Sequence, residues 1–373
     1  ALGKVQTIAR IPKVDGVLAQ FDKQLPFELT PGQREVSAQI FGDLKSEHPM
    51  HRLLQGEVGS GKTIVALRAA LNVIDAGAQV ALLAPTEVLA QQHHRTILKQ
   101  LGALATKGQL GAPEEAIEIA LLTGSLSAAE KREIQARCKD GQINLVIGTH
   151  ALLSEAVNFS DLGLVIVDEQ HRFGVEQRDA LRAKANTPPH LLVMTATPIP
   201  RTVAITVFGD LDISTLTELP LGRAPIATHL VNAMTKPAYL ERAWQRIKEE
   251  VKAGHQAYVV APRISSETAE DADIEFLFGT ESKDLNSVTN LAPELSTGPL
   301  KGLKIALLHG KLPPDEKEAT MQAFSNKQIE VLVATSVIEV GVDVPNATVM
   351  VIMDADSFGI SQLHQLRGRI GRG

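Results

Sequence analysis

The most specific chemical signal in the sequence is the run GEVGSGKT at residues 56–63. It fits the pattern G-x-x-x-x-G-K-T, and it follows an aliphatic segment and opens a helical pattern, which is the context in which such a loop binds phosphate. Glycines let successive backbone N–H groups turn toward a phosphate chain, and the helix N-terminus adds a positive dipole. Lys62 would reach the β- and γ-phosphates, and the Thr63 hydroxyl would hold Mg²⁺. The sequence therefore predicts a nucleoside triphosphate site made by Gly56, Gly59, Ser60, Gly61, Lys62 and Thr63.

A second run, LVIVDEQH at residues 164–171, supplies the carboxylates that hydrolysis requires. Four aliphatic residues predict a buried strand, which places Asp168 at its carboxyl end, where α/β sheets bind ligands. Asp168 would hold Mg²⁺ through water, and Glu169 could orient or deprotonate the attacking water. A strand that ends in Asp-Glu is common by itself, so the glycine loop upstream is what favours the catalytic interpretation. The presence of Glu169 therefore favours a protein that hydrolyses the nucleotide over one that only binds it.

The end of the chain is dense in arginine and glycine, in the run QLRGRIGR at residues 365–372. Such a run is also typical of a solvated turn or an RNA-binding tail. If a second sheet faces the first, the guanidinium groups of Arg369 and Arg372 would reach the γ-phosphate, and arginines in that position contribute roughly 10³–10⁵ in rate. Hydrolysis would then depend on domain closure, as a motor requires.

Two stretches of the chain alternate short aliphatic runs with amphipathic patterns, which predicts α/β domains with doubly wound parallel sheets. In the first stretch we expect strands at 52–54, 80–84, 117–122, 145–148, 164–168 and 191–195, and helices at 62–76, 87–101 and 127–138. In the second we expect strands at 226–231, 257–261, 305–308, 331–334 and 349–353, and helices at 237–253 and 314–324. The expected domains are an N-terminal remnant or linker (1–25), a first domain (26–216), a linker (217–226) and a second domain (227–373) with an acidic surface insertion at about 265–302.

Composition places the chain among soluble globular proteins. Of the 373 residues, 44% are hydrophobic and 21% are charged, and no apolar run approaches the roughly 18 residues of a membrane helix. The single Cys138 excludes an intramolecular disulfide framework, and without a secretory signal we expect a cytoplasmic protein. The net charge is −6, and it neither supports nor excludes DNA, because residues 265–284 alone account for the excess of acid. Aromatic residues make up only 3%, so we expect any nucleic acid to be held by its backbone.

The order of these motifs resembles the superfamily 2 helicases and translocases. That resemblance implies two tandem RecA-like domains with ATP in the cleft between them. It also implies nucleotide contacts by Phe27, Gln33, Gly341 and Asp343, with Gln33 reading adenine. The motifs APTE (84–87), GTHA (148–151), TAT (195–197) and TSVIEVGVD (335–343) match elements that contact DNA or couple it to the nucleotide. The residues implied in those contacts are Thr86, Thr149, His150, His171, Thr195, Thr197, Thr335 and Gln365.

Five longer runs look like those of the bacterial RecG family, and the likeness covers nearly the whole chain from about residue 25. The runs are DEQHRFGVEQR (168–178), MTATPIPRT (194–202), ELPLGRAPI (218–226), VIEVGVDVPNA (337–347) and QLHQLRGRIGRG (362–373). The transcription-repair coupling translocase shares HRFG and TATPIPRT, but its motif normally reads Asp-Glu-Glu-His, so Gln170 favours RecG. The resemblance implies an ATP- and Mg²⁺-dependent motor, acting as a monomer on branched double-stranded DNA in recombination and repair, with single-strand-binding protein as a candidate partner.

RecG-like enzymes also have an N-terminal oligonucleotide-fold wedge and, after the arginine motif, a helical hairpin. We therefore expect a fragment that carries the motor. Three alternatives stay open: a transcription-coupled translocase, an ATP-driven switch that recruits a partner without moving on DNA, and a DNA-binding scaffold with vestigial ATPase parts. Glu169 and the paired arginines argue against the switch. We interpret His93 and His94 as structural or DNA-proximal rather than as metal ligands, and we expect His171 to contact the Thr195–Thr197 loop.

Overall fold

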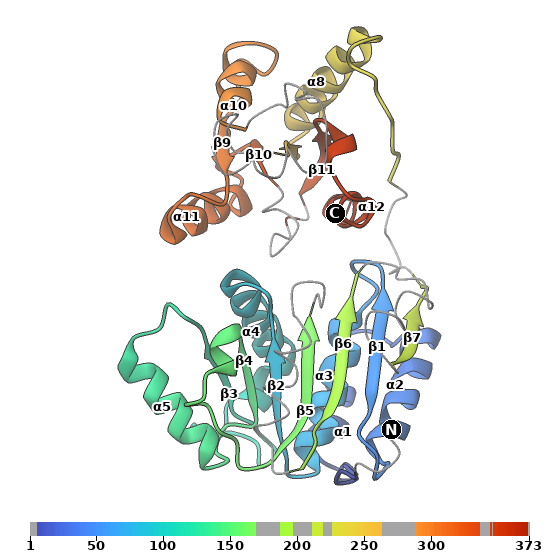
Figure 1. Cartoon of the computed structure of the whole chain (residues 1–373), viewed down its shortest axis with the longest axis vertical. Helices are drawn as coiled ribbons and strands as arrows, with labels where there is room; N and C mark the ends of the chain where they lie inside the picture. Colours follow the sequence, from blue (N-terminus) through green and yellow to red (C-terminus); the bar gives the residue numbers. More distant parts are fainter. Residues whose placement is uncertain are drawn as a thin grey trace, which may run out of the picture. The chain divides into compact units, whose positions relative to one another are not determined.

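The computed structural model describes residues 6–168, 187–196, 211–218, 226–262, 288–335, 344 and 346–371. The chain divides into two compact units, Ala1–Pro220 and Leu221–Gly373. In the described residues each unit is built on one parallel sheet, and the strand arrows within each sheet run in the same direction (Figure 1). No helix in these ranges is long and apolar enough to cross a bilayer.

Unit 1 contains a seven-stranded sheet with helices packed against it. The strands are β1 (His51–Gly56), β2 (Gln79–Leu83), β3 (Ile119–Leu122), β4 (Leu145–Gly148), β5 (Leu162–Asp168), β6 (His190–Thr195) and β7 (Asp212–Leu216). The helices are α1 (Val17–Gln24), α2 (Pro31–Leu44), α3 (Lys62–Asp75), α4 (Glu87–Leu101) and α5 (Ala128–Lys139), with 3₁₀ turns η2 (Gly102–Ala105) and η3 (His150–Leu153). The strand order β3-β4-β2-β5-β6-β1-β7 places the first strand between the last two, so after β1 the chain crosses to the far half of the sheet (β2, β3, β4) and returns through β5 and β6 to β7.

The aliphatic strands fill the interior of this sheet. Every residue of β2, β4 and β6 is buried, as parallel strands covered on both faces require. The pairing aligns the carboxyl ends of the strands, since Gln55 of β1 lies opposite Thr195 of β6 and Asp168 of β5 lies opposite Met194. The loops that follow β1, β5 and β6 therefore leave the sheet at one edge.

Unit 2 repeats this arrangement with fewer strands. Its described elements are α8 (Pro237–Lys252), β8 (Gln256–Val260), α10 (Val288–Thr297), β9 (Ile305–Leu308), α11 (Pro314–Ser325), β10 (Val331–Ala334), β11 (Ala347–Ile352), η6 (Ala355–Ser357) and α12 (Ile360–Arg367). The strands pair in parallel in the order β11-β8-β10-β9. Two buried clusters of apolar side chains cover the sheet, one around Tyr258 and Phe324 and the other around Trp244 and Leu295.

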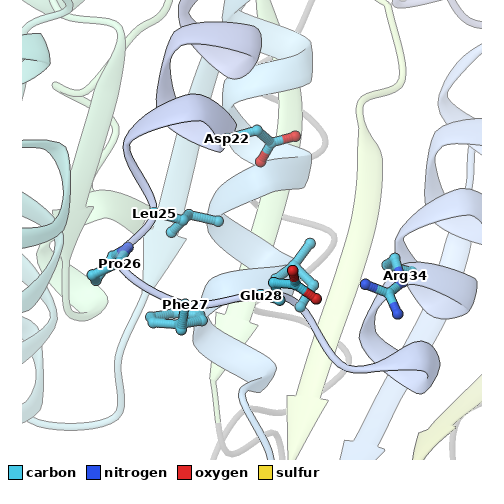
Figure 2. Close-up of a pocket in the computed structure, with 7 residues that line it drawn as sticks. Asp22, Leu25, Pro26, Phe27, Glu28 and Arg34 are labelled. Carbon is cyan, nitrogen blue, oxygen red and sulfur yellow. The ribbon is translucent and has the colours of Figure 1, made fainter.

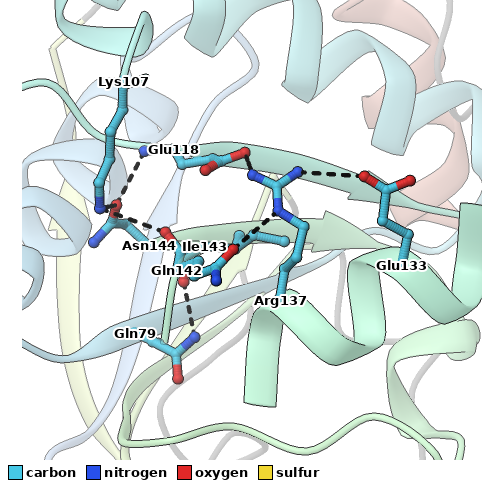
Figure 3. Close-up of polar contacts among 8 residues, drawn as sticks. All are labelled: Gln79, Lys107, Glu118, Glu133, Arg137, Gln142, Ile143 and Asn144. Carbon is cyan, nitrogen blue, oxygen red and sulfur yellow. Dashed lines mark hydrogen bonds and ion pairs between the residues drawn. The ribbon is translucent and has the colours of Figure 1, made fainter. Parts of the chain in front are cut away.

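A buried glutamine at the start of β2 ties the sheet of unit 1 to α5. Gln79 Nε2 donates to the backbone oxygens of Cys138 (2.9 Å) and Ile143 (2.8 Å), while its Oε1 accepts from the Ser160 N–H (2.8 Å). Figure 3 shows Gln79 below the polar cluster in which Arg137 pairs with Glu118. One side chain thus hydrogen-bonds backbone groups at the end of α5, in the loop that follows it and in the residues before β5. Buried backbone groups require such partners where no helix or strand supplies them.

The same arrangement recurs in unit 2. Gln256 at the start of β8 donates through Nε2 to the backbone oxygens of Phe324 (2.7 Å) and Ile329 (2.6 Å). Phe324 lies in the last turn of α11 and Ile329 follows the helix, as Cys138 and Ile143 do at α5. The strands that precede α5 and α11, β3 and β9, both read Ile-Ala-Leu-Leu. The two units therefore share their architecture down to single hydrogen bonds, as two copies of one fold do.

Most of the expected elements are confirmed. The helix at 87–101 and the strands at 145–148, 305–308 and 331–334 have the expected bounds. Residues 226–231 form no strand, and residues 288–302, which we expected within a surface insertion, include α10, whose Leu291 and Leu295 are buried in the core of unit 2. The rest of the expected insertion, 265–287, lies outside the described residues.

The segment before residue 26 packs into unit 1. Arg10 makes a two-pronged ion pair with Asp161, at 2.6 and 2.7 Å, and its backbone oxygen accepts from Asn72 Nδ2. The carboxylate of Asp75, at the end of α3, caps the start of α1 by accepting the backbone N–H groups of residues 17 and 18. Burial raises the pKa of Asp75, while these two hydrogen bonds act in the opposite direction. Residues 6–24 are thus fixed to the body of unit 1.

His190 is the first residue of β6 and is fully buried. Its Nδ1 accepts the backbone N–H of Met50 at 3.0 Å, which joins β6 to the residue before β1. The pKa of His190 is lowered to about 4, chiefly by burial and also by Arg10, while a hydrogen bond with the Ile8 backbone and the charge of Asp43 act in the opposite direction. The imidazole is therefore neutral in the folded chain at neutral pH.

We expect acid to destabilise unit 1 through His190. Because its pKa is about 4 when folded and about 6.5 when unfolded, the unfolded chain binds the extra proton between these values, and stability falls as the pH falls from 6.5 to 4, by about 3 kcal/mol at most. His190→Asn keeps an acceptor for Met50 but cannot titrate. Urea unfolding at pH 7 and pH 4.5 should show a larger loss of stability in the wild type than in the variant. An equal loss in both proteins would contradict this role.

Candidate nucleotide and DNA site

The glycine loop between β1 and α3 has the backbone shape that a phosphate requires. Gly59 and Gly61 both have φ of 88°, in the left-handed region that favours glycine. Gly61 is the residue before α3, and no side chain caps that end of the helix in the described residues. The first N–H groups of α3 thus face the loop without a capping side chain, which suits an anion.

Lys62 and Ser60 turn toward this loop. Lys62 Nζ donates to the backbone oxygens of Gly56 (2.7 Å) and Glu57 (3.0 Å), so the ammonium group lies beside the loop. Ser60 Oγ is buried and has no hydrogen-bond partner among the described residues. A left-handed glycine backbone, an uncapped helix start, a poised ammonium group and an unpaired hydroxyl together fit the triphosphate that the sequence predicts.

Gln33 connects α2 to the glycine loop. It is almost fully buried, and its Nε2 donates to the backbone oxygen of Ser60 at 3.0 Å. Its Oε1 accepts the Thr30 N–H (3.0 Å), and the Thr30 hydroxyl accepts the Gln33 N–H (3.2 Å), which forms a capping box at the start of α2. Adenine reading by Gln33 stays a prediction. The capping role was missed at the sequence level, although Thr-x-x-Gln before a helical pattern is its signature.

An open hollow of about 460 Å³ lies between the end of α1 and the start of α2 (Figure 2). It is lined by Asp22, Leu25, Pro26, Phe27, Glu28, Leu29 and Arg34. Figure 2 shows Phe27 on the loop that joins the helices and Arg34 on α2 across from Glu28. Phe27 is 51% exposed, and an aromatic side chain this open, six residues before Gln33 in the sequence, offers a flat apolar face to a ligand.

Asp168 ends β5, as expected, and it contacts a histidine. His93 Nε2 of α4 lies 2.7 Å from Asp168 Oδ2, and the two side chains are only 11% and 13% exposed. From the sequence, His93 was interpreted as a structural or DNA-proximal residue on a helix face. Its partner could not be predicted, because only the folded chain brings α4 onto the end of β5. Burial, together with the nearby Arg95, lowers the pKa of the neighbouring His94.

Of the eight residues expected at DNA, five have side chains that the structure describes, and four of these are buried within their own unit. Thr86 is the exception, since it is partly exposed and its hydroxyl caps α4 by accepting the Leu89 N–H at 3.3 Å. Thr149 is 1% exposed, and its hydroxyl has no partner among the described residues. The other buried members of the set are Thr195, Thr335 and Gln365. Their DNA contacts stay a prediction.

Of the other expected site residues, some lie within the described ranges and six lie outside them. Arg369 is partly exposed after α12, and the backbone of His150 forms part of η3. Six residues lie outside the described ranges: Glu169, His171, Thr197, Gly341, Asp343 and Arg372. The described half of the site is therefore the glycine loop, Asp168 and the residues around them.

Comparison with known families defines the class of this chain. The DEAD/DEAH box helicase model matches residues 30–205, and the model of the helicase conserved C-terminal domain matches residues 242–373. The two matched regions fall in the two compact units. The chain is a helicase core of two RecA-like domains, which confirms the expected fold class.

Relatives identify the family within this class. The ATP-dependent DNA helicase RecG of Mycobacterium tuberculosis is 60% identical over 363 residues, which is 97% of this chain and 48% of the relative. RecG of Bacillus subtilis is 46% identical over 95% of this chain and 48% of its own length. The chain belongs to the RecG family, and it spans about half the length of the curated relatives that it matches.

Solved structures agree with this assignment. The structure of RecG bound to a three-way DNA junction has a TM-score of 0.72 and 40% sequence identity, over 98% of this chain and 44% of that one. The Mycobacterium smegmatis helicase Lhr, bound to single-stranded DNA and AMP-PNP, has a TM-score of 0.62 at 20% identity, over 96% of this chain and 45% of that one. The likeness to Lhr concerns the fold alone.

We expect Gly61→Ala to destabilise unit 1 by about 1–3 kcal/mol, because an alanine is strained at this φ and its Cβ would overlap the Gln33 amide. Gly42→Ala is the matched control. Gly42 lies in α2 with open space around it, so alanine should stabilise the helix by about 0.5–1 kcal/mol. Urea unfolding of both variants measures the difference. A Gly61→Ala variant as stable as the wild type would contradict the role of the left-handed glycine.

Proposed function

We propose that this chain is the two-domain motor of an ATP-dependent double-strand DNA translocase that remodels branched DNA, such as stalled replication forks and Holliday junctions, in recombination and repair. One observation carries the proposal: a phosphate-binding loop and an acidic strand end share one edge of a parallel sheet in a chain of the RecG family.

The glycine loop would hold the triphosphate and Mg²⁺. The N–H groups of Gly59 and Gly61 would bind phosphate oxygens, while the Ser60 N–H donates to the Glu57 backbone oxygen. Lys62 would neutralise the β- and γ-phosphates, and the Thr63 hydroxyl with Asp168 would hold the metal. A bound Mg²⁺ supplies charge neutralisation at the phosphates. Strand β6 separates β1 from β5, so their ends lie two strand spacings or roughly 10 Å apart, which leaves room for a phosphate group and its metal.

The base of the nucleotide would occupy the hollow beside Phe27. A purine ring stacks on an exposed aromatic face, and the volume of about 460 Å³ lies within the usual range for ligand pockets. Gln33 would read adenine. The Gln33 amide also donates a hydrogen bond to the Ser60 backbone oxygen of the glycine loop. Binding of the base at Gln33 would therefore affect the conformation of the loop that holds the phosphates.

Residues of both units would complete the reaction. Glu169 of unit 1 would orient the attacking water. From unit 2, Arg369 and Arg372 would stabilise charge at the γ-phosphate when the domains close, and Gly341 and Asp343 would contact the nucleotide. Closure would shift the DNA-facing elements at Thr86, Thr149, His150, Thr195, Thr197, Thr335 and Gln365, with His171 in the coupling.

DNA is the proposed polymer, held through its backbone. Support comes from RecG, which has been solved on a three-way DNA junction at 40% identity to this chain. A cytoplasmic monomer that works with single-strand-binding protein completes the proposal. The RecG relatives favour this function over a transcription-repair coupling translocase. A switch without translocation would bind ATP without needing Glu169.

We expect Lys62→Ala to abolish ATP turnover and to weaken nucleotide binding, because the phosphates lose their cation. Arg369→Ala should leave binding nearly intact and slow hydrolysis by about 10³-fold or more, because its charge acts on the transition state. Fluorescent-nucleotide titration and steady-state phosphate release measure the two effects separately. Lys139→Ala, at the exposed end of α5, and Arg367→Ala, on the exposed face of α12, are matched controls. Equal loss of ATP affinity in Lys62→Ala and Arg369→Ala would refute the arginine role.

A further inference from the structure

A polar side chain interrupts the apolar stripe of α4. The buried residues of this helix are Leu89, Ala90, His93, Ile97 and Leu101, which lie on one face at helical spacing. Four of the five are apolar and pack into unit 1. A histidine in such a stripe costs free energy unless its polar nitrogen is hydrogen-bonded, so its partner explains its presence.

That partner is the carboxylate that ends β5. His93 Nε2 and Asp168 Oδ2 are 2.7 Å apart, at the short end of the range for nitrogen–oxygen hydrogen bonds, and both side chains are nearly buried. An ionised carboxylate only accepts hydrogen bonds, so Nε2 is the nitrogen that carries the proton and donates it. The packed neighbours on α4 fix the direction of the imidazole, and the imidazole in turn fixes the carboxylate.

We propose that His93 is a positioning residue for Asp168, which it holds in the orientation that binds the divalent cation of the nucleotide complex. The inference rests on the proposed function, because it assigns Asp168 to that cation. A carboxylate has acceptor sites on both oxygens, so a hydrogen bond to Oδ2 orients the group without using up its capacity as a ligand. Residues that orient metal-binding side chains in this way typically contribute 10–100-fold to metal affinity.

The test uses Mn²⁺ as a paramagnetic substitute for Mg²⁺. Electron paramagnetic resonance measures how tightly the full chain, saturated with AMP-PNP, binds Mn²⁺, and fluorescent-nucleotide titration in EDTA measures nucleotide affinity without metal. We expect His93→Leu to weaken Mn²⁺ binding by about 10–100-fold and to leave the affinity in EDTA unchanged. His93→Gln, whose Nε2 reaches about as far as the imidazole Nε2, should restore most of the metal affinity. His94→Leu, on the adjacent position of the same helix, is the control and should bind Mn²⁺ as the wild type does.

A folded His93→Leu variant that binds Mn²⁺ as tightly as the wild type would overturn the inference. If circular dichroism shows that His93→Leu does not fold, His93→Asn replaces it: this side chain is polar but too short to reach Asp168, so it should show the same loss of Mn²⁺ affinity, and wild-type affinity would again overturn the inference. Failure of the wild-type chain to bind any nucleotide would refute the proposed function itself. Nucleotide binding by every variant, with no difference in metal affinity, would refute only the role of His93.

Discussion

Parallel pairing of the strands in unit 1 is the constraint on which the rest of the site depends. Because β1, β6 and β5 run in the same direction and in register, the loop after Gly56, the residue Thr195 and the carboxylate of Asp168 leave the sheet at one edge. An antiparallel neighbour would send one of these groups to the opposite edge, more than 15 Å away for strands of about five residues. Buried aliphatic residues without polar alternation are what makes this pairing stable.

Buried polar side chains then set the exact positions at this edge. Gln33 joins the start of α2 to the Ser60 carbonyl of the glycine loop, and His93 joins α4 to Asp168. Both link a helix to a strand end or loop that is proposed to touch the nucleotide. Since α4 is also capped by Thr86, a residue expected at DNA, the same helix contacts the proposed metal ligand and begins at a proposed DNA contact. The polar contacts of Gln79 and Gln256, by contrast, lie at the starts of their strands and hold each sheet to its helix.

The sequence predicts what depends on local pattern and fails where distant segments meet. The glycine loop, the helix at 87–101 and the strand that ends at Asp168 follow from spacing and hydrophobicity, and the structure has them. The contact of Gln33 with Ser60 and that of His93 with Asp168 depend on which elements pack together, which no local pattern encodes. Residues 288–302 were expected in an insertion because they continue an acidic segment and show no clear hydrophobic periodicity. Leu291 and Leu295 nevertheless lie at helical spacing and reach the core. Residues 226–231 are rich in β-branched side chains but form no strand, because propensity alone provides no neighbour to pair with.

Steady-state ATP hydrolysis by the chain, alone and with saturating branched DNA, beside the variant Glu169→Gln, tests the motor account most directly. The account predicts turnover that rises when DNA is added and disappears in Glu169→Gln, while ATP binding persists in both proteins. Tight ATP binding without turnover in the wild-type chain, or turnover that Glu169→Gln leaves unchanged, would contradict it.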